Sequence, residues 1–231
     1  MKYKSVVEGT FLSRPNRFIA YVLIDGREET VHVKNTGRCR ELLTDGAKVF
    51  LSVSDNPKRK TKYDLIAVEK QRSGKESLLI NLDSQIPNDA ADEWLKNGRM
   101  FSENAVIRRE VFYGKSRFDL YVEDGERKAF IEVKGVTLEN DGVASFPDAP
   151  TERGIKHLEE LVHAAGNGYE AYILFVVQMK GVHLFKPNTE RHPEFAVALK
   201  KAHDKGVGIL VMDCNVTEDS IEIDSTVDYE L

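Results

Sequence analysis

The sequence is poor in cysteine and has no long apolar run. Its two cysteines, Cys39 and Cys214, have no metal-ligand spacing. This usage argues against structural disulfides and a zinc site, and it is typical of a reducing compartment. No apolar run approaches the roughly 20 residues that a membrane helix needs, and Met1-Lys2-Tyr3-Lys4 is not followed by a signal-peptide core. We therefore expect a cytoplasmic protein with no membrane contact.

Several catalytic signatures are also missing. The sequence contains no GxxxxGK(S/T) phosphate loop, no GxSxG nucleophile elbow and no HExxH zinc helix. Their absence argues against P-loop nucleotide hydrolases, serine esterases and zinc peptidases. The apolar fraction of 41% is enough for packed cores, and 231 residues allow one large or two small domains.

Charge is distributed unevenly along the chain. Residues 1–75 carry 16 Lys and Arg against 9 Asp and Glu, a balance of +7, whereas residues 76–231 carry 17 against 29, a balance of −12. A basic segment joined to an acidic remainder indicates a polyanion-binding module attached to a second domain. Ser73-Gly74-Lys75 is the expected boundary, which predicts domains at 1–75 and 76–231.

The first segment has the pattern of a small β-barrel. Turn signals separate five stretches of strand-forming residues: Val6–Leu12, Phe18–Ile24, Thr30–Val33, Val49–Val53 and Tyr63–Val68. A short helix is expected at Arg38–Leu43. Five strands with an inserted helix fit an OB-like barrel, and an SH3-like barrel is the alternative because strand order decides between them.

The basic residues of this segment lie at its turns, where phosphates can reach them while the barrel stays rigid. The predicted nucleic-acid-binding residues are Arg14, Arg17, Thr36, Arg38, Lys58, Arg59 and Lys60. Phe11, Phe18 and Tyr63 are the aromatic side chains available to stack on bases. The alternation of their strands favours a core position for Phe11 and Phe18 instead.

A β-hairpin at Arg117–Lys134 is the most informative stretch of the second segment. Its two runs alternate on either side of Asp124-Gly125. An even-length loop places Asp119 on the face of Glu132 and Lys134, either diagonal to Glu132 or directly opposite it. Two carboxylates this close favour a cation between them, and a hard ion such as Mg²⁺ or Mn²⁺ prefers such oxygen ligands. An ordinary surface ion pair is the other interpretation.

The other elements of the second segment indicate an α/β layer arrangement with a mixed sheet. They are expected as a strand at Leu78–Leu82, a helix at Ala90–Lys96, a polar loop at Thr137–Ser145, a helix with Thr151 as N-cap, a buried strand at Tyr172–Val177, a helix at Glu194–Ala202, a second buried strand at Val207–Met212 and an edge strand at Ser220–Ile223. Arg153 and His157 share a helix face and are possible supporting residues, as is Glu110 one strand before Asp119.

These residues also carry a family resemblance. Asp119 followed by Glu132-Val133-Lys134 looks like the core of PD-(D/E)XK nucleases, with Phe118 in place of the usual proline. Longer motifs resemble the sugar fermentation stimulation protein A (SfsA) family over nearly the whole chain: Arg14–Phe18, Asn35–Gly37, Ser54–Lys60, Gly114–Asp119, Ile131–Leu138 and Phe146–Gly154. The resemblance implies an OB-like DNA-binding domain, a PD-(D/E)XK nuclease-like domain, and the Val133 carbonyl as a third metal ligand beside Asp119 and Glu132.

The sequence therefore predicts a DNA-binding, metal-dependent nuclease in which Lys134 positions water and offsets developing charge. The alternative is a non-catalytic DNA-binding regulator of sugar-metabolism genes, which the family's name implies. RNA remains open as a substrate. The oligomeric state is also open, a homodimer included.

Overall fold

The computed structural model describes residues 1–35 and 37–231, and these residues form two compact units. The first unit consists of Met1–Ile86, Gln178–Lys180 and Cys214–Glu222. The second consists of Pro87–Val177, Gly181–Asp213 and Ile223–Leu231. Within the described residues, no helix is both long and apolar enough to cross a membrane.

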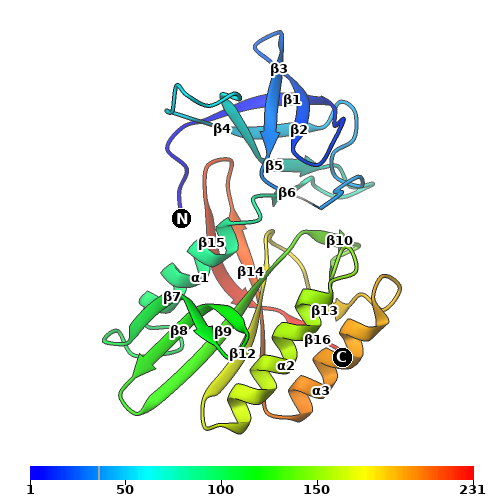
Figure 1. The fold of residues 1–231 in the computed structure, drawn as a ribbon. Helices are drawn as coiled ribbons and strands as arrows, with labels where there is room; N and C mark the ends of the chain where they lie inside the picture. The colour runs from blue at the N-terminus through cyan, green and yellow to red at the C-terminus, as the bar shows by residue number, and fades with distance from the viewer. Residues whose placement is uncertain (36) are drawn as a thin grey trace. The chain divides into compact units, whose positions relative to one another are not determined.

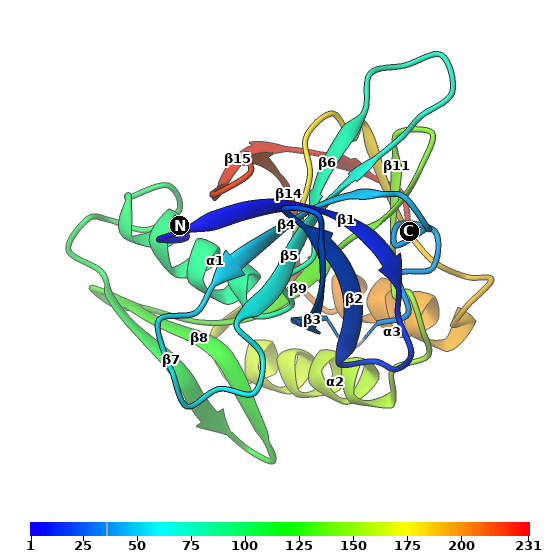
Figure 2. The ribbon, with the colours of Figure 1, turned by 90° about the horizontal axis from the view of Figure 1, so that it is seen from above.

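The first unit is built on a closed barrel, as predicted (Figures 1 and 2). Its sheet has the order β3-β2-β1-β4-β5-β6, and an additional pairing of β3 with β5 closes it. This strand order identifies the barrel as OB-like and not SH3-like. The strands are β1 (Val6–Ser13), β2 (Ile19–Ile24), β3 (Arg27–Val33), β4 (Lys48–Val53), β5 (Tyr63–Lys70) and β6 (Leu78–Asn81).

Alternation along β2 shows how the sequence sets the barrel interior. Ala20, Val22 and Ile24 are buried on one side of the strand. This alternation predicted a core position for Phe18, and that prediction is wrong, because Phe18 is 56% exposed. The reason is that β2 begins one residue later and the chain turns at Asn16, which takes Phe18 out of the strand's period of two.

Two further expectations for the first unit have clear outcomes. Phe11 is in the core at 3% exposure, as predicted. The helix expected at Arg38–Leu43 is absent from this described stretch, which forms a turn instead. Cys39 lies there with a positive φ of 44°, a left-handed conformation that does not continue a helix.

The predicted mixed sheet belongs mostly to the second unit and has the order β15-β14-β12-β9-β8-β7. β7, β8 and β9 pair antiparallel, whereas β12 pairs parallel to both β9 and β14. The two predicted buried strands are β12, at the centre of this sheet, and its neighbour β14. The bounds are β7 (Val106–Tyr113), β8 (Ser116–Asp124), β9 (Arg127–Val136), β12 (Glu170–Val177), β14 (Gly208–Val216) and β15 (Ile221–Thr226).

Three helices accompany this sheet: α1 (Ile86–Lys96), α2 (Glu152–Gly166) and α3 (Pro193–Asp204). Thr151 caps α2 as predicted, since its hydroxyl accepts from the Gly154 amide at 3.0 Å. Leu158 and Leu161 on the apolar stripe of α2 are buried. α2 packs against β12, β8 and β9, and it lies beside α3 (Figure 1).

The expectation of a polar loop at Thr137–Ser145 is wrong. This stretch forms a hairpin of β10 (Leu138–Asn140) and β11 (Val143–Phe146), which joins β13 (Leu184–Pro187) and β16 (Asp228–Tyr229) in the order β10-β11-β13-β16. Asp141 and Gly142 have φ values of 51° and 87° and form the two-residue turn. Asp-Gly is the sequence signal for such a turn, and it is present here.

Candidate functional site

The β8–β9 hairpin brings the two predicted carboxylates together. Asp124 pairs with Arg127, so the turn consists of Gly125 and Glu126, and the register runs back to Leu120 opposite Ile131. Continued by one residue, this register places Asp119 across from Glu132. It is the directly opposed arrangement of the two that the sequence allowed.

Glu132 is the most enclosed carboxylate of the site, with a side chain 2% exposed. Its Oε1 accepts from Lys134 Nζ at 2.5 Å and also contacts His157 Nδ1. Its Oε2 is buried and has no hydrogen-bond partner among the described residues. One oxygen is therefore held by two donors, while the other keeps its lone pairs for a further group.

Asp119 is half-buried beside this group. Its Oδ1 accepts from Asn88 Nδ2 at 2.9 Å, and its Oδ2 accepts from the Val133 amide at 2.8 Å. A carboxylate has about four lone-pair positions, so both oxygens can accept one more contact. Asn88 lies on α1, and sequence reasoning missed it because nothing in the sequence connects this helix to the hairpin.

The pKa values of the two carboxyls move in opposite directions. Burial raises the pKa of Asp119, and the neighbouring charge of Glu132 raises it further. Burial also acts to raise the pKa of Glu132, but His157 and Lys134 outweigh it, so this pKa is lowered. The site therefore holds a stable carboxylate beside one that ionises reluctantly. A cation between them would favour ionisation of both.

His157 links α2 to the carboxylates. As predicted from their spacing, Arg153 and His157 meet on one face of α2, with Arg153 Nε 3.3 Å from His157 Nε2. Arg153 can only donate, so Nε2 accepts, and the proton of a neutral ring lies on Nδ1, which faces Glu132. Arg153, His157 and Glu132 thus form a chain of contacts that fixes the orientation of Glu132.

Glu110 is placed differently from the other predicted supporting residues. Its carboxylate pairs with Arg117 at 3.3 Å and is 62% exposed. Glu110 has a positive φ of 57° within β7. Among the described residues, the Glu110 carboxylate therefore pairs with Arg117 and not with the groups around Asp119 and Glu132.

The carboxylate pair offers oxygen ligands to a divalent metal ion. No group of three or more His, Cys, Asp and Glu side chains arranged for a metal occurs in residues 1–35 and 37–231. Two carboxylates with a buried, unpartnered Oε2 nevertheless fit Mg²⁺, which is commonly held by one or two carboxylates while water and substrate phosphates complete its shell. The residues present therefore suit an oxygen-liganded ion and not a zinc centre.

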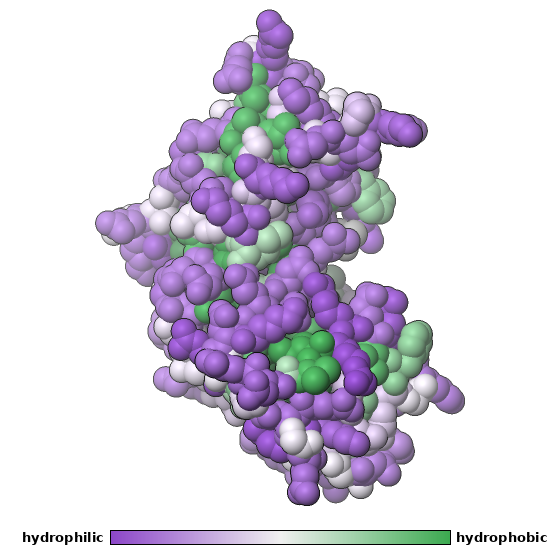
Figure 3. Space-filling model, turned by 90° about the vertical axis from the view of Figure 1, so that its left-hand side faces the viewer, coloured by the Kyte–Doolittle hydropathy of each residue, from purple (hydrophilic) through white to green (hydrophobic). Residues whose placement is uncertain are grey.

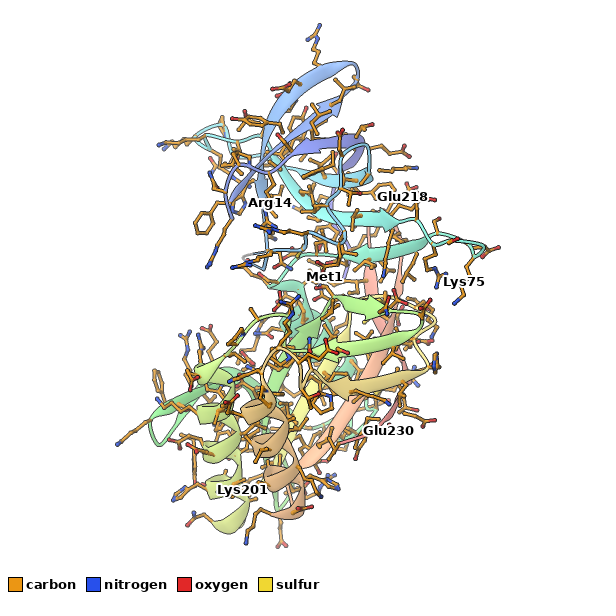
Figure 4. The ribbon with its side chains drawn as sticks, turned by 90° about the vertical axis from the view of Figure 1, so that its right-hand side faces the viewer. Met1, Arg14, Lys75, Lys201, Glu218 and Glu230 are labelled. Carbon is orange, nitrogen blue, oxygen red and sulfur yellow. The ribbon has the colours of Figure 1, made fainter. Side chains whose placement is uncertain are left out.

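Arg14, predicted to bind nucleic acid, is engaged within the barrel unit. Its guanidinium donates to the backbone carbonyls of Arg17 and Asn35 at 2.7 and 2.6 Å, and to those of Gly37 and Arg38 at 2.9 Å each. Figure 4 labels Arg14 among the loops of this unit. Arg14 thus ties together the two loops that carry Arg17 and Arg38.

Arg59 is also engaged. Its guanidinium makes a two-pronged contact with Asp64 at 2.7 and 2.6 Å, and His32 Nδ1 lies 2.8 Å from the same carboxylate. Burial acts to raise the pKa of Asp64, but Arg59 and His32 outweigh it and lower it. Arg59 therefore braces the start of β5.

The other predicted loop residues face solvent. Arg17, Arg38, Lys58 and Lys60 are exposed, and their side chains form no ion pair within the described part of the chain. Thr36, also predicted to bind nucleic acid, lies outside the described residues. The face drawn in Figure 3 is largely hydrophilic with small hydrophobic patches. Exposed Lys and Arg on turns are the kind of contact that phosphates use.

Two family models match this chain. The "SfsA N-terminal OB domain" matches residues 12–78, and the "Sugar fermentation stimulation protein RE domain" matches residues 85–220. The chain belongs to the SfsA family.

Curated members of the SfsA family align with the chain from end to end. A sugar fermentation stimulation protein homolog of Desulfitobacterium hafniense (strain Y51) is 58% identical over 231 residues, covering 100% of this chain and 99% of the relative. A homolog of Clostridium beijerinckii is 54% identical over 231 residues, and the alignment covers 100% of this chain and 100% of the relative. The solved structure of Pyrococcus furiosus SfsA in complex with Ca²⁺ is 28% identical, with a TM-score of 0.87 over 100% of this chain and 98% of the other.

Proposed function

We propose that this SfsA-family chain is a DNA-binding, metal-dependent nuclease. The observation that carries the proposal is the pair Asp119 and Glu132. Glu132 Oε2 is buried without a hydrogen-bond partner among the described residues. The Asp119 carboxyl ionises reluctantly, because burial and the neighbouring charge of Glu132 raise its pKa. A buried carboxylate oxygen of this kind is costly unless a cation reaches it.

The chain's residues divide the work at such a site. Asp119 and Glu132 would hold Mg²⁺ or Mn²⁺, with the Val133 carbonyl as a third ligand by family resemblance. A bound ion polarises a phosphoryl oxygen and lowers the pKa of a bound water. Lys134 Nζ lies 2.5 Å from Glu132 Oε1, where its charge can orient water and offset the negative charge that develops on the phosphoryl oxygens. His157 holds Glu132 in position, as outer partners of metal ligands commonly do.

The Ca²⁺ named with the Pyrococcus furiosus relative supports the metal part of the proposal. Ca²⁺ and Mg²⁺ are both hard ions that take oxygen ligands. The barrel unit would supply affinity through Arg17, Arg38, Lys58 and Lys60, which are exposed on turns. The positive balance of residues 1–75 favours a polyanion as the partner.

The second candidate is a non-catalytic DNA-binding regulator of sugar-metabolism genes. It is favoured by one observation: across the described ranges, no third His, Cys, Asp or Glu side chain joins the two carboxylates in a metal-binding group. This function uses the barrel loops alone. It gives no reason for the enclosed carboxylate at Glu132.

The deciding experiment is a cleavage assay on single- and double-stranded DNA and RNA, with and without Mg²⁺ or Mn²⁺. We expect Glu132→Ala, the near-isosteric Glu132→Gln and Asp119→Asn each to reduce metal-dependent cleavage to background, because each removes a negatively charged ligand. Glu126→Ala is the matched control, since Glu126 is exposed at the turn of the same hairpin. Circular dichroism checks that each variant is folded. Cleavage by all three site variants at the parent's rate would refute the assignment.

A further inference from the structure

Phe18 stands out within the barrel unit because it is a large aromatic side chain that is mostly exposed to solvent. It is 56% exposed, whereas Phe11 and Phe50 of the same unit are 3% and 2% exposed. An isolated exposed apolar residue carries little information. Phe18, however, follows Arg17 directly, and Arg17 is exposed on the same loop between β1 and β2.

The loop that carries Phe18 is held from several sides. Asn16 Oδ1 accepts from the amides of Phe18 and Ile19 at 2.9 and 3.0 Å, and the Phe18 carbonyl accepts from the Val33 amide at 2.8 Å. Arg14 anchors the same loop through the Arg17 carbonyl at 2.7 Å. The ring of Phe18 is thus presented on a fixed backbone, which lowers the conformational entropy cost of binding.

The hydrogen bonds of Arg14 connect this loop to a second one. The guanidinium that holds Arg17 also holds the carbonyl of Arg38, whose own side chain is exposed. An aromatic face and two guanidinium groups are therefore gathered on two loops that the Arg14 side chain ties together. Phosphates suit the guanidinium groups, and the flat face of an unpaired base suits the ring.

We propose that Phe18 is a base-stacking platform, and that the nucleic acid bound by the barrel unit carries unpaired bases. This inference rests on the proposed function and names its substrate class as single-stranded nucleic acid. In a duplex, the base faces are already stacked on their neighbours, so Phe18 has nothing to cover except at an end. A single strand offers a base to the ring and a phosphate to Arg17 or Arg38.

The test compares binding of four labelled ligands by fluorescence anisotropy without metal, so that cleavage plays no part. The ligands are a deoxythymidine oligonucleotide, an abasic oligonucleotide of equal length and charge, and a DNA duplex; an oligouridine of the same length distinguishes RNA from DNA. We expect Phe18→Ala to weaken binding of the deoxythymidine strand by about 5-fold to about 150-fold, which corresponds to the range of about 1–3 kcal/mol for stacking of one base. Binding of the abasic strand and of the duplex should stay at the parent's level.

Two further variants separate stacking from simple hydrophobic contact. Phe18→Leu should lose as much affinity as Phe18→Ala because it keeps apolar bulk but no aromatic face, and Phe18→Trp should bind at least as well as the parent. Phe112→Ala is the matched control, since Phe112 is an aromatic residue 75% exposed in the other unit. Its affinity for the strand should not change.

Several results would overturn the inference. Equal loss on the abasic strand would indicate a disturbed loop, and full affinity of Phe18→Leu would indicate a hydrophobic contact of the kind a protein partner makes. Unchanged binding of the strand by Phe18→Ala would remove Phe18 from the binding surface. Failure of the proposed function would give a different result: the protein would bind the strand in a Phe18-dependent way but would show no cleavage in the nuclease assay.

Discussion

Replacing the two lysines of the Ser54–Lys60 motif in one variant and its arginine in another should separate residues that bind DNA from a residue that stabilises the barrel. Lys58 and Lys60 are exposed and form no ion pair within the described residues, whereas Arg59 grips Asp64 through two nitrogens. We expect Lys58→Gln with Lys60→Gln to weaken DNA binding and leave stability unchanged. We expect Arg59→Gln to destabilise the barrel and to change the salt dependence of binding little.

The magnitude follows from how enclosed the ion pair is. The Asp64 side chain is 11% exposed and that of Arg59 is 31% exposed. Exposed pairs contribute about 0–1 kcal/mol, and removing one partner of a fully buried pair costs about 3–5 kcal/mol. The intermediate exposure suggests a cost of about 2 kcal/mol for Arg59→Gln, part of which His32 offsets because it still contacts Asp64 at 2.8 Å.

This cost should depend on pH with a definite sign. The folded-state pKa of Asp64 is lowered by Arg59 and His32 against the opposing effect of burial. The contribution of a carboxyl with a lowered pKa is present above its unfolded pKa, about 3.9 for Asp, and is lost as pH falls through the lower folded value. The difference between parent and Arg59→Gln should thus be present at neutral pH and shrink as pH falls below about pH 4.

Hydrogen–deuterium exchange is the suitable assay because the protein has two units and a single unfolding transition is not guaranteed. A loss of about 2 kcal/mol should speed exchange of β5 amides about 30-fold where exchange follows the opening equilibrium. Amides of α2 in the other unit serve as the internal control. In parallel, each DNA phosphate that Lys58→Gln or Lys60→Gln leaves unneutralised should flatten the slope of log affinity against log salt by about 0.7 to 0.9. Equal protection of β5 in Arg59→Gln and in the lysine variant would refute this division of roles.

Three further predictions concern the carboxylate site. Lys134→Met should keep most Mn²⁺ affinity by calorimetry but lose most cleavage, since its proposed interaction is with the transition state; equal losses would contradict that role. His157→Ala should lower metal affinity or cleavage about 10- to 100-fold, as is usual for a residue that orients a ligand, with Glu159→Ala on the exposed side of α2 as control. Mn²⁺ affinity should fall as pH falls through the raised pKa of Asp119, because the ion needs the carboxylate, and Asn88→Ala should move this fall to higher pH since its hydrogen bond lowers that pKa. An unmoved pH profile would exclude Asn88 as a modulator of Asp119.

The hairpin was predictable because its information is local. A period of two and an even-length turn are enough to bring Asp119 and Glu132 to one face, and only the choice between two registers needed the structure. The pair Arg153 and His157 was predictable for the same reason, since residues four apart on a helix are neighbours. Asn88 was not predictable, because it reaches Asp119 from α1, 31 residues earlier in the chain.

The loops of the barrel mark the limit of sequence reasoning for the opposite reason. Turn signals in the sequence placed Arg14, Arg17, Lys58 and Arg59 correctly at turns. A long basic side chain on a turn, however, can either face solvent or fold back onto the protein. Arg14 finds four backbone carbonyls and Arg59 finds a carboxylate, and neither partner set is visible in a local pattern. The two uses are linked: a positively charged loop contributes more to recognition when its backbone is already fixed, because ordering the loop on binding would oppose affinity. Arg14 and Arg59 fix the backbone of these loops, and the exposed Arg17, Arg38, Lys58 and Lys60 are the side chains that we propose to contact phosphates.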